Sequence, residues 1–264
     1  MKEGQTLWTK EQSKLALNLY SKIPFGQMHH SNNHVKELAE LIGRTPGAVA
    51  RRLGNFASLD PKLQERGIKG LPNTSKLDEE VWNEFMVDWD DQFIDSEKLL
   101  AQKKNTSIEK LYKVDLDKYE QRDGKEALRS IKVRLNQEIF RGVVLSNFNN
   151  QCCITGIKFT QLIVASHITT WRDDSKNRLN PKNGLALNAL HDRAFDQHLI
   201  TVTEDLKIKI SSKFYKHENV LSIKQNFIDF DGKDIIAPEK FDPDASFLKI
   251  HNDKFAKKSS LISD

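Results

Sequence analysis

The stretch "ASHITTWRDDSKNRLNPKNGLALNALHDRAFD", residues 165–196, decides how the second half of the chain is expected to fold. It begins at the end of an apolar run, "LIVAS", and it closes with "LNALHDRAFD", which is typical of a helix. A polar loop with glycine and proline separates the two segments. The order predicts a strand that ends at His167, a loop that contains Asn183 and a helix that carries His191.

The segments around this stretch complete an α+β domain. Upstream, "EALRSIKVRLNQEIFRGVVLSNF" has apolar residues at helical spacing, and "QCCITG" and "TQLIVASHI" are β-rich runs separated by a short turn. Downstream, "LITVT" and "KIKIS" are expected to form a second hairpin. We therefore expect helix, β-hairpin, long loop, helix and hairpin over residues 126–215, followed by a C-terminal extension over residues 216–264.

Residues 1–60 show apolar side chains at helical spacing and predict three short helices. The second helix is expected to stop at Gly43, and Thr45 followed by Pro46 is a typical start for the third. Residues 61–125 begin with "RGIKGLPNTS", which is rich in turn formers, and continue with strongly charged helical segments. This part is predicted to be a charged helical connector.

Composition limits the class of protein. The chain has 264 residues, of which 30% are charged, and its net charge of +4 permits a nucleic-acid partner without requiring one. No apolar run is long enough to span a membrane, and the polar start "MKEGQTLWTKEQ" is unlike a signal peptide, so we expect a cytoplasmic protein with no membrane partner. Cys152 and Cys153 are adjacent and cannot provide four ligands, so no structural zinc is expected.

The two histidines and their neighbours predict a site for hydrolysis of a phosphodiester. A histidine at the end of a strand, here His167, can take a proton from water, while a histidine on a facing helix, here His191, can offer a ring nitrogen to a divalent cation. Asp196, or Asp192 as the alternative, can share that ion. Asn183 can hold the backbone or orient the base through its amide.

Four motifs in the same order resemble the HNH family of ββα-metal nucleases, in particular its restriction-like branch. They are "CITG" at residues 153–156, "ASHITTW" at 165–171, "NPKNGLAL" at 180–187 and "LHDRAFD" at 190–196. The resemblance covers about 80 residues. It implies an endonuclease that hydrolyses double-stranded DNA with Mg²⁺ or another divalent cation such as Mn²⁺.

The resemblance also implies roles for single residues. It places the general base at His167, the family's central asparagine at Asn183 and its helix histidine, a metal ligand, at His191, so these three form the expected catalytic set. Asp196 is the expected acidic ligand, with Asn183 also in the metal group. Many HNH nucleases carry an acidic residue or a histidine just before the base, where this chain has Ser166. Asp173, Asp174 or waters could then complete the metal shell.

The N-terminal segment resembles Myb/SANT-like helix-turn-helix domains, through "LWTKEQ" in the first helix and "GRTPGAVARRL" in the last. This resemblance implies a DNA-binding module, and the residues that it places on the DNA are Arg44, Thr45, Arg51, Arg52 and Asn55. Arg178 is expected to contact a phosphate near the cut.

Taken together, the patterns predict a bacterial or phage restriction-like or defence nuclease. One HNH site cuts one strand, so double-strand cleavage would call for a homodimer or repeated nicking. The alternative is a sequence-specific DNA-binding regulator with a catalytically inactive HNH fold, for which Ser166 is the main support. A protein-interaction scaffold that uses the charged middle segment is a third possibility.

Overall fold

The first helix shows how the local sequence sets the start of the fold. Thr9 caps α1 (Lys10–Lys22): its hydroxyl accepts a hydrogen bond from the backbone amide of Gln12, and the Gln12 side chain accepts one from the backbone amide of Thr9.

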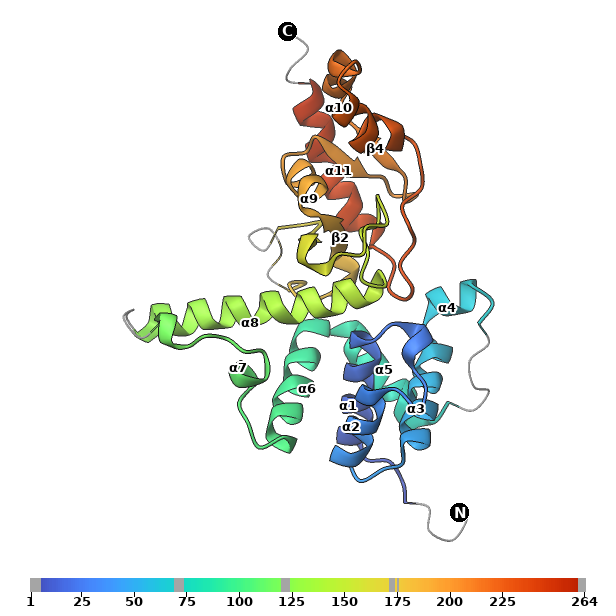
Figure 1. Ribbon diagram of the computed structural model, residues 1–264. Helices are drawn as coiled ribbons and strands as arrows, with labels where there is room; N and C mark the ends of the chain where they lie inside the picture. The colour runs from blue at the N-terminus through green and yellow to red at the C-terminus, as the bar shows by residue number, and fades with distance from the viewer. Residues whose placement is uncertain (1–5, 69–73, 120–123, 171–173, 175, 261–264) are drawn as a thin grey trace. The chain divides into compact units, whose positions relative to one another are not determined.

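The computed structural model describes residues 6–68, 74–119, 124–170, 174 and 176–260 (Figure 1). Within these ranges no helix combines the length and apolar character needed to cross a membrane.

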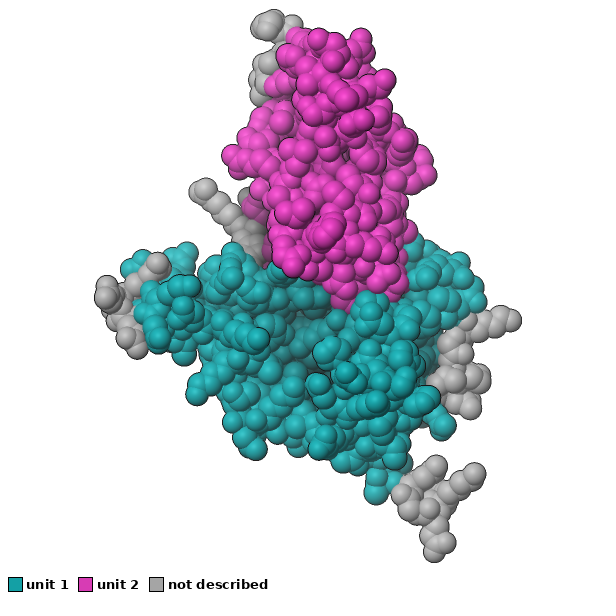
Figure 2. Space-filling model, in the orientation of Figure 1, with its two compact units in different colours: residues 1–143 teal, residues 144–264 magenta. Residues whose placement is uncertain are grey.

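The chain forms two compact units, residues 1–143 and 144–264, which Figure 2 colours separately. The boundary falls inside the long helix α8 (Gly124–Asn147). Each unit has buried apolar residues of its own, for example Leu53 and Phe56 in the first and Leu187 and Phe195 in the second.

In the first unit the three helices expected over residues 1–60 are present. They are α1, α2 (Asn33–Leu41) and α3 (Pro46–Leu59), and they pack against one another. Gly43 follows α2 with φ 66°, a left-handed conformation that favours glycine, and Thr45 caps α3 in front of Pro46. The capping signals in the sequence therefore identified this turn. The short elements η1 (Phe25–Gln27) and α4 (Pro61–Glu65) follow α1 and α3.

The segment expected to be a charged connector contributes to the core of the first unit. It forms α5 (Lys76–Val87) and α6 (Trp89–Lys103), which pack against α1, together with α7 (Ile108–Leu111) and η2 (Asp117–Tyr119) (Figure 1). Four aromatic side chains on α5 and α6 are buried, namely Trp82, Phe85, Trp89 and Phe93. On each helix the two aromatic side chains are three or four residues apart and so share a face, although acidic residues surround them in the sequence.

The second unit is built around a hairpin that differs from the predicted one. After η3 (Thr160–Leu162), strand β1 (Ile163–His167) pairs antiparallel with β2 (Gly184–Asn188), so that Ile163 lies opposite Asn188 and His167 opposite Gly184. The prediction that "QCCITG" forms the partner strand was wrong, because Cys153 begins a turn and Cys152, just before it, is in no strand. β2 follows η4 (Pro181–Asn183) and is buried at every position, so it lacks the alternation that reveals a half-exposed strand.

Helix α9 (Ala189–Asp196) follows β2 directly and packs against β1, β2 and β3. The second predicted hairpin is confirmed as β3 (Ile200–Val202) and β4 (Ile208–Ile210). The remaining elements are η5 (Ser212–His217), α10 (Leu221–Asn226), η6 (Ile228–Phe230) and α11 (Ala245–Ser260). The expected C-terminal extension is thus part of the second unit, since α11 packs on β3 and buries Leu248 and Phe255.

Candidate active site

His167 is the last residue of β1, and its ring is fixed by the loop that follows. The Nε2 atom lies 2.9 Å from the backbone carbonyl oxygen of Arg178. A carbonyl only accepts, so Nε2 carries the hydrogen and the lone pair of the neutral ring is at Nδ1. Burial lowers the pKa of His167 to about 4, although the bond to the Arg178 carbonyl opposes this shift. The ring is therefore neutral at pH 7, which a general base requires.

Asn183 holds the loop that presents the Arg178 carbonyl. Its Oδ1 accepts bonds from the backbone N–H of Thr169 at 2.8 Å and from the Thr169 hydroxyl at 2.9 Å. Its Nδ2 donates to the carbonyl oxygens of Thr169 at 3.2 Å and Asn177 at 3.1 Å. The side chain is almost completely buried. All of its bonds are directed into the loop, so the amide sets the position of the segment that orients His167.

His191 lies at the third position of α9, where it is 1% exposed. Its Nε2 is 2.6 Å from the carbonyl oxygen of Asn226, and its Nδ1 is 2.9 Å from the Nδ2 of Asn188. The Asn226 carbonyl accepts from Nε2–H, and the Asn188 amide donates to Nδ1. The edges of Phe227 and Phe230 enclose the ring. Both ring nitrogens thus connect α9 to neighbouring parts of the unit.

Two carboxylates lie on α9, the helix that packs against β1. Asp192 is half-buried and Asp196 is exposed, and their separation of four residues places them on one helical face. The pKa of Asp192 is raised chiefly by burial and further by the charge of Asp196. The Ser166 hydroxyl lowers the pKa of Asp192 and so lies close to it, although this buried hydroxyl makes no hydrogen bond of normal geometry with any described residue.

The structure therefore separates the expected site residues into two groups. His167 and Asn183 meet through the loop that follows β1, whereas His191 is directed toward Asn226. Asp174 accepts bonds from the Lys176 amide and the Asn177 side chain, and Asp173 lies outside the described residues. Among the residues that the structure describes, no three histidine, cysteine, aspartate or glutamate side chains group closely enough to hold a metal ion.

Several groups that shape this site were not singled out from the sequence. Asn188 is the N-cap of α9, and its position directly before "ALHDRAFD" is a signal that capping rules could have found. The carbonyl groups of Arg178 and Asn226 have no such signal, because any residue type carries a backbone carbonyl. Cys152 is a buried free cysteine close to this site. Although burial opposes the shift, contacts with His191 and Thr155 lower its pKa to about 7.

Most of the residues expected to bind DNA in the first unit have partners within the protein. Arg44 donates to the backbone oxygen of Thr6 at 2.8 Å and lies over the ring of Trp8. Arg52 is buried, forms an ion pair with Asp78, and lies over the ring of the same tryptophan at 4.3 Å from the ring centroid. Burial lowers the pKa of Arg52 to about 10. These arginines connect the start of the chain, α3 and α5.

The remaining members of that set differ in their exposure. Asn55 donates to the second carboxylate oxygen of Asp78 at 2.9 Å, and Thr45 caps α3 through the Ala48 amide. Arg51 is exposed on α3. In the second unit, Arg178 is half-buried, and its carbonyl is the group that contacts His167.

The comparisons with known proteins point to the same region of the second unit. A family model described as HNH endonuclease matches residues 152–203, a segment that contains His167, Asn183, His191 and Asp196. No curated protein matches the chain. The matched segment is therefore similar to HNH endonucleases, which act on DNA and generally use divalent metal ions.

Proposed function

We propose that the chain is a DNA endonuclease that hydrolyses phosphodiester bonds with a divalent cation, and that His167 is its general base. The observation that carries this proposal is the state of His167: a neutral imidazole whose Nε2–H is held by the Arg178 carbonyl. In this tautomer Nδ1 takes the proton from an attacking water. The bond from water to phosphorus forms while the bond from phosphorus to the 3′ oxygen breaks.

Asn183 acts on this reaction as a positioning residue. Its four hydrogen bonds fix Thr169 and Asn177, two positions in the loop that connects β1 to η4. Because these bonds use both ends of the amide, we assign Asn183 to the loop and remove it from the proposed metal ligands. The Arg178 carbonyl then keeps the imidazole in one tautomer, as a rigid acceptor does in other base sites.

The oxygen atoms beside β1 suit a hard divalent cation such as Mg²⁺ or Mn²⁺. Asp192 and Asp196 repel each other, and the buried Ser166 hydroxyl lies close to Asp192 and forms no hydrogen bond of normal geometry within the described part of the chain. Magnesium is commonly held by one or two carboxylates together with water and substrate phosphates. When bound, such an ion stabilises negative charge on the phosphate oxygens.

His191 has a different role in this proposal. A ring that is 1% exposed, with its two nitrogens bonded to Asn188 and Asn226, is placed to stabilise the fold. We therefore assign the metal to Asp192 and Asp196, and we assign His191 to the packing of α9. This arrangement keeps the carboxylates at a fixed position relative to β1, since α9 packs against that strand.

The first unit is proposed to bind double-stranded DNA through a Myb/SANT-like helix-turn-helix arrangement of α1, α2 and α3. The exposed Arg51 on α3 supports this assignment, while Arg44 and Arg52 support the fold of the unit. We further propose a restriction-like or defence role, and double-strand cleavage by a homodimer, since one active site cuts one strand.

Plasmid cleavage tests this function directly. We expect nicking in Mg²⁺ or Mn²⁺, none in EDTA, and a loss of about 10²- to 10⁴-fold in His167→Ala, as is typical when a general base is removed. His217→Ala is the matched control, because His217 is exposed in the same unit. Binding of DNA without cutting in any divalent ion would instead support a DNA-binding regulator. The internal bonds of His191 are the observation that favours that alternative.

A further inference from the structure

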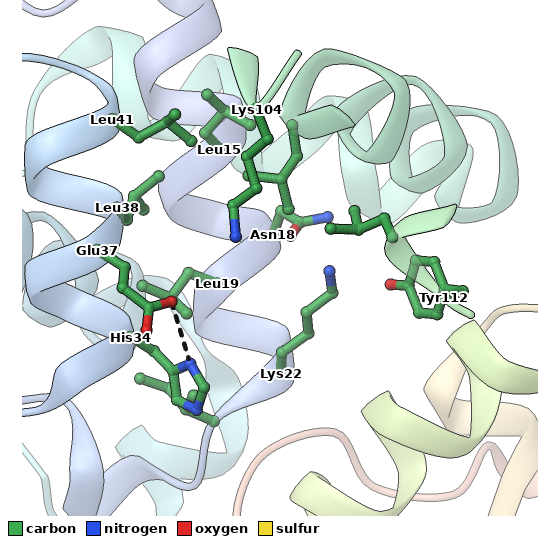
Figure 3. A pocket seen from close by; sticks show the side chains of 13 residues that line it. Leu15, Asn18, Leu19, Lys22, His34, Glu37, Leu38, Leu41, Lys104 and Tyr112 are labelled. Carbon is green, nitrogen blue, oxygen red and sulfur yellow. Dashed lines mark ion pairs between the residues drawn. The ribbon is translucent and has the colours of Figure 1, made fainter. Parts of the chain in front are cut away.

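The charged groups around the cavity of the first unit balance one another. This cavity lies between α1, α2, α6 and α7 (Figure 3). Among the described residues, Lys22 and Lys104 line it together with Glu37, and the buried Glu97 forms an ion pair with Lys22. The two ammonium groups are thus matched by two carboxylates, so the cavity has no excess charge that would select an ion.

The last helix of the second unit, α11, carries an excess of positive charge. Its sequence includes four lysines and one aspartate, and the aspartate, Asp253, forms an ion pair with Lys249. The other three lysines, Lys254, Lys257 and Lys258, occupy the last two turns. Cations are favoured near the C-terminus of any helix, so the positions of these lysines relative to other groups decide whether they serve a partner.

His251 fixes one face of α11 against the end of α9 (Figure 1). Its ring stacks on Phe195 with the ring centroids 3.7 Å apart, and its Nε2 lies 3.1 Å from Nδ1 of His198. On a helix, Lys254 and Lys258 lie about 60° and about 20° around the axis from His251, so the three residues share a face. The two lysines therefore lie on the side of α11 that packs against the end of α9.

The charges that act on His198 agree with this placement. Burial lowers the pKa of His198, and the ammonium groups of Lys258 and Lys254 lower it further, whereas Asp196 raises it. Both lysines are half-buried, as is usual where the alkyl stem packs on the protein and the ammonium end stays in water. Lys258 makes no ion pair or side-chain hydrogen bond within the described ranges. Two ammonium groups thus lie close to the end of α9 that carries Asp196.

We propose that Lys254 and Lys258 form a contact surface for the DNA backbone beside the cut, an inference that rests on the proposed nuclease function. Asp196 is a proposed ligand of the metal, so the lysines lie next to the place where the scissile phosphate would bind. Duplex DNA carries one negative charge per about 1.7 Å of its axis, so the same substrate presents further phosphates at this place.

This surface would hold DNA without reading its sequence. Ammonium groups contact phosphates in the same way whatever the bases are. A metal ion bound to Asp196 would neutralise that carboxylate, which would then compete less with phosphates for the lysines. Helix α11 lies outside residues 152–203, so the family match does not imply this surface.

Fluorescence anisotropy of the full chain with a labelled duplex tests the surface in EDTA, where no strand is cut. Each phosphate contact contributes a slope of about −0.9 to the plot of log affinity against log salt concentration. We expect the slope to become less steep by about 0.9 in Lys258→Gln and by about 1.8 in Lys254→Gln/Lys258→Gln. Lys249→Gln is the matched control, because it removes the same charge from the opposite side of α11 and should keep the wild-type slope.

Lys258→Arg separates contact with DNA from a role in packing. It keeps the positive charge and should keep the wild-type slope, so a slope as shallow as that of Lys258→Gln would overturn the proposal. An unchanged slope in the double variant, or an equal change in Lys249→Gln, would also overturn it, even where the wild type nicks plasmid. DNA binding with the expected slopes but no cutting in any divalent ion would instead overturn the nuclease function and leave the contact surface.

Discussion

Asn183 offers a quantitative test of how the candidate site is held together. Replacement by alanine removes four hydrogen bonds and leaves the backbone N–H and hydroxyl of the buried Thr169 without an acceptor. Each unsatisfied buried group costs about 1–3 kcal/mol. The lost bond to the Asn177 carbonyl adds little to this cost, because Asn177 is half-buried and water can hydrate that oxygen. We therefore expect Asn183→Ala to lower the free energy of local opening by about 3 kcal/mol.

Hydrogen–deuterium exchange of the peptide that covers β1 and Thr169 measures this loss. In EDTA, so that no metal contributes, exchange in Asn183→Ala should be about a hundredfold faster than in the wild type. Asn180→Ala is the control, because Asn180 is half-buried and makes two side-chain bonds in the same loop. It should change the free energy of opening by about 1 kcal/mol or less.

Asn183→Asp distinguishes the positioning role from a metal-binding role. Aspartate keeps an acceptor for Thr169 but places a carboxylate oxygen where Nδ2 donates to two carbonyl groups, so exchange should be at least as fast as in Asn183→Ala. If Asn183 were a metal ligand, the carboxylate would preserve cleavage in Mg²⁺. Exchange at the wild-type rate together with wild-type cleavage in Asn183→Asp would refute the positioning role.

Five further variants test other contacts in the two units. His191→Ala should destabilise the second unit by about 1–3 kcal/mol because it leaves the buried Asn188 side chain without its partner, while the half-buried Asn226 carbonyl can be hydrated. Asp192→Asn should abolish cleavage in Mg²⁺ without destabilising the protein; urea unfolding and plasmid nicking check both variants. Arg52→Ala should lower the unfolding free energy by about 3–5 kcal/mol because it leaves the buried carboxylate of Asp78 without its ion pair. Arg51→Ala should instead weaken DNA binding in a gel-shift assay with little change in stability. Burial and the neighbouring His198 lower the pKa of His251 to about 3 in the folded protein. The stability that the neutral ring contributes is therefore fully present above pH 6.5 and is lost as the pH falls toward 3. Between pH 7 and 5 the unfolding free energy of the wild type should fall by about 2 kcal/mol more than that of His251→Gln.

The sequence predicted those parts of the fold in which local signals decide the structure. The turn at Gly43 and the cap at Thr45 placed α2 and α3, and the alternating residues of β3 and β4 revealed that hairpin. The partner of β1 could not be recognised in this way. This partner, β2, is buried on both faces, and it directly follows an Asn-Pro segment that is typical of a turn.

The positions of the candidate site residues were easier to predict than the directions of their side chains. The helix that carries His191 is present, but the partner of its Nε2 is Asn226, which lies 35 residues later in the chain. Arg52 lies on α3 as expected, yet its partner Asp78 belongs to a segment that resembled a solvated connector. Both contacts are set by tertiary packing, which one sequence does not encode in any local pattern.

Rescue of His167→Gly by imidazole tests the central claim most directly. The variant lacks the ring but keeps β1, and the chain with His217→Gly serves as the control for the added buffer. We predict that His167→Gly does not cut plasmid in Mg²⁺ alone and that neutral imidazole restores cleavage in proportion to its concentration. Wild-type cleavage by His167→Gly without imidazole would contradict the assignment of His167 as the general base.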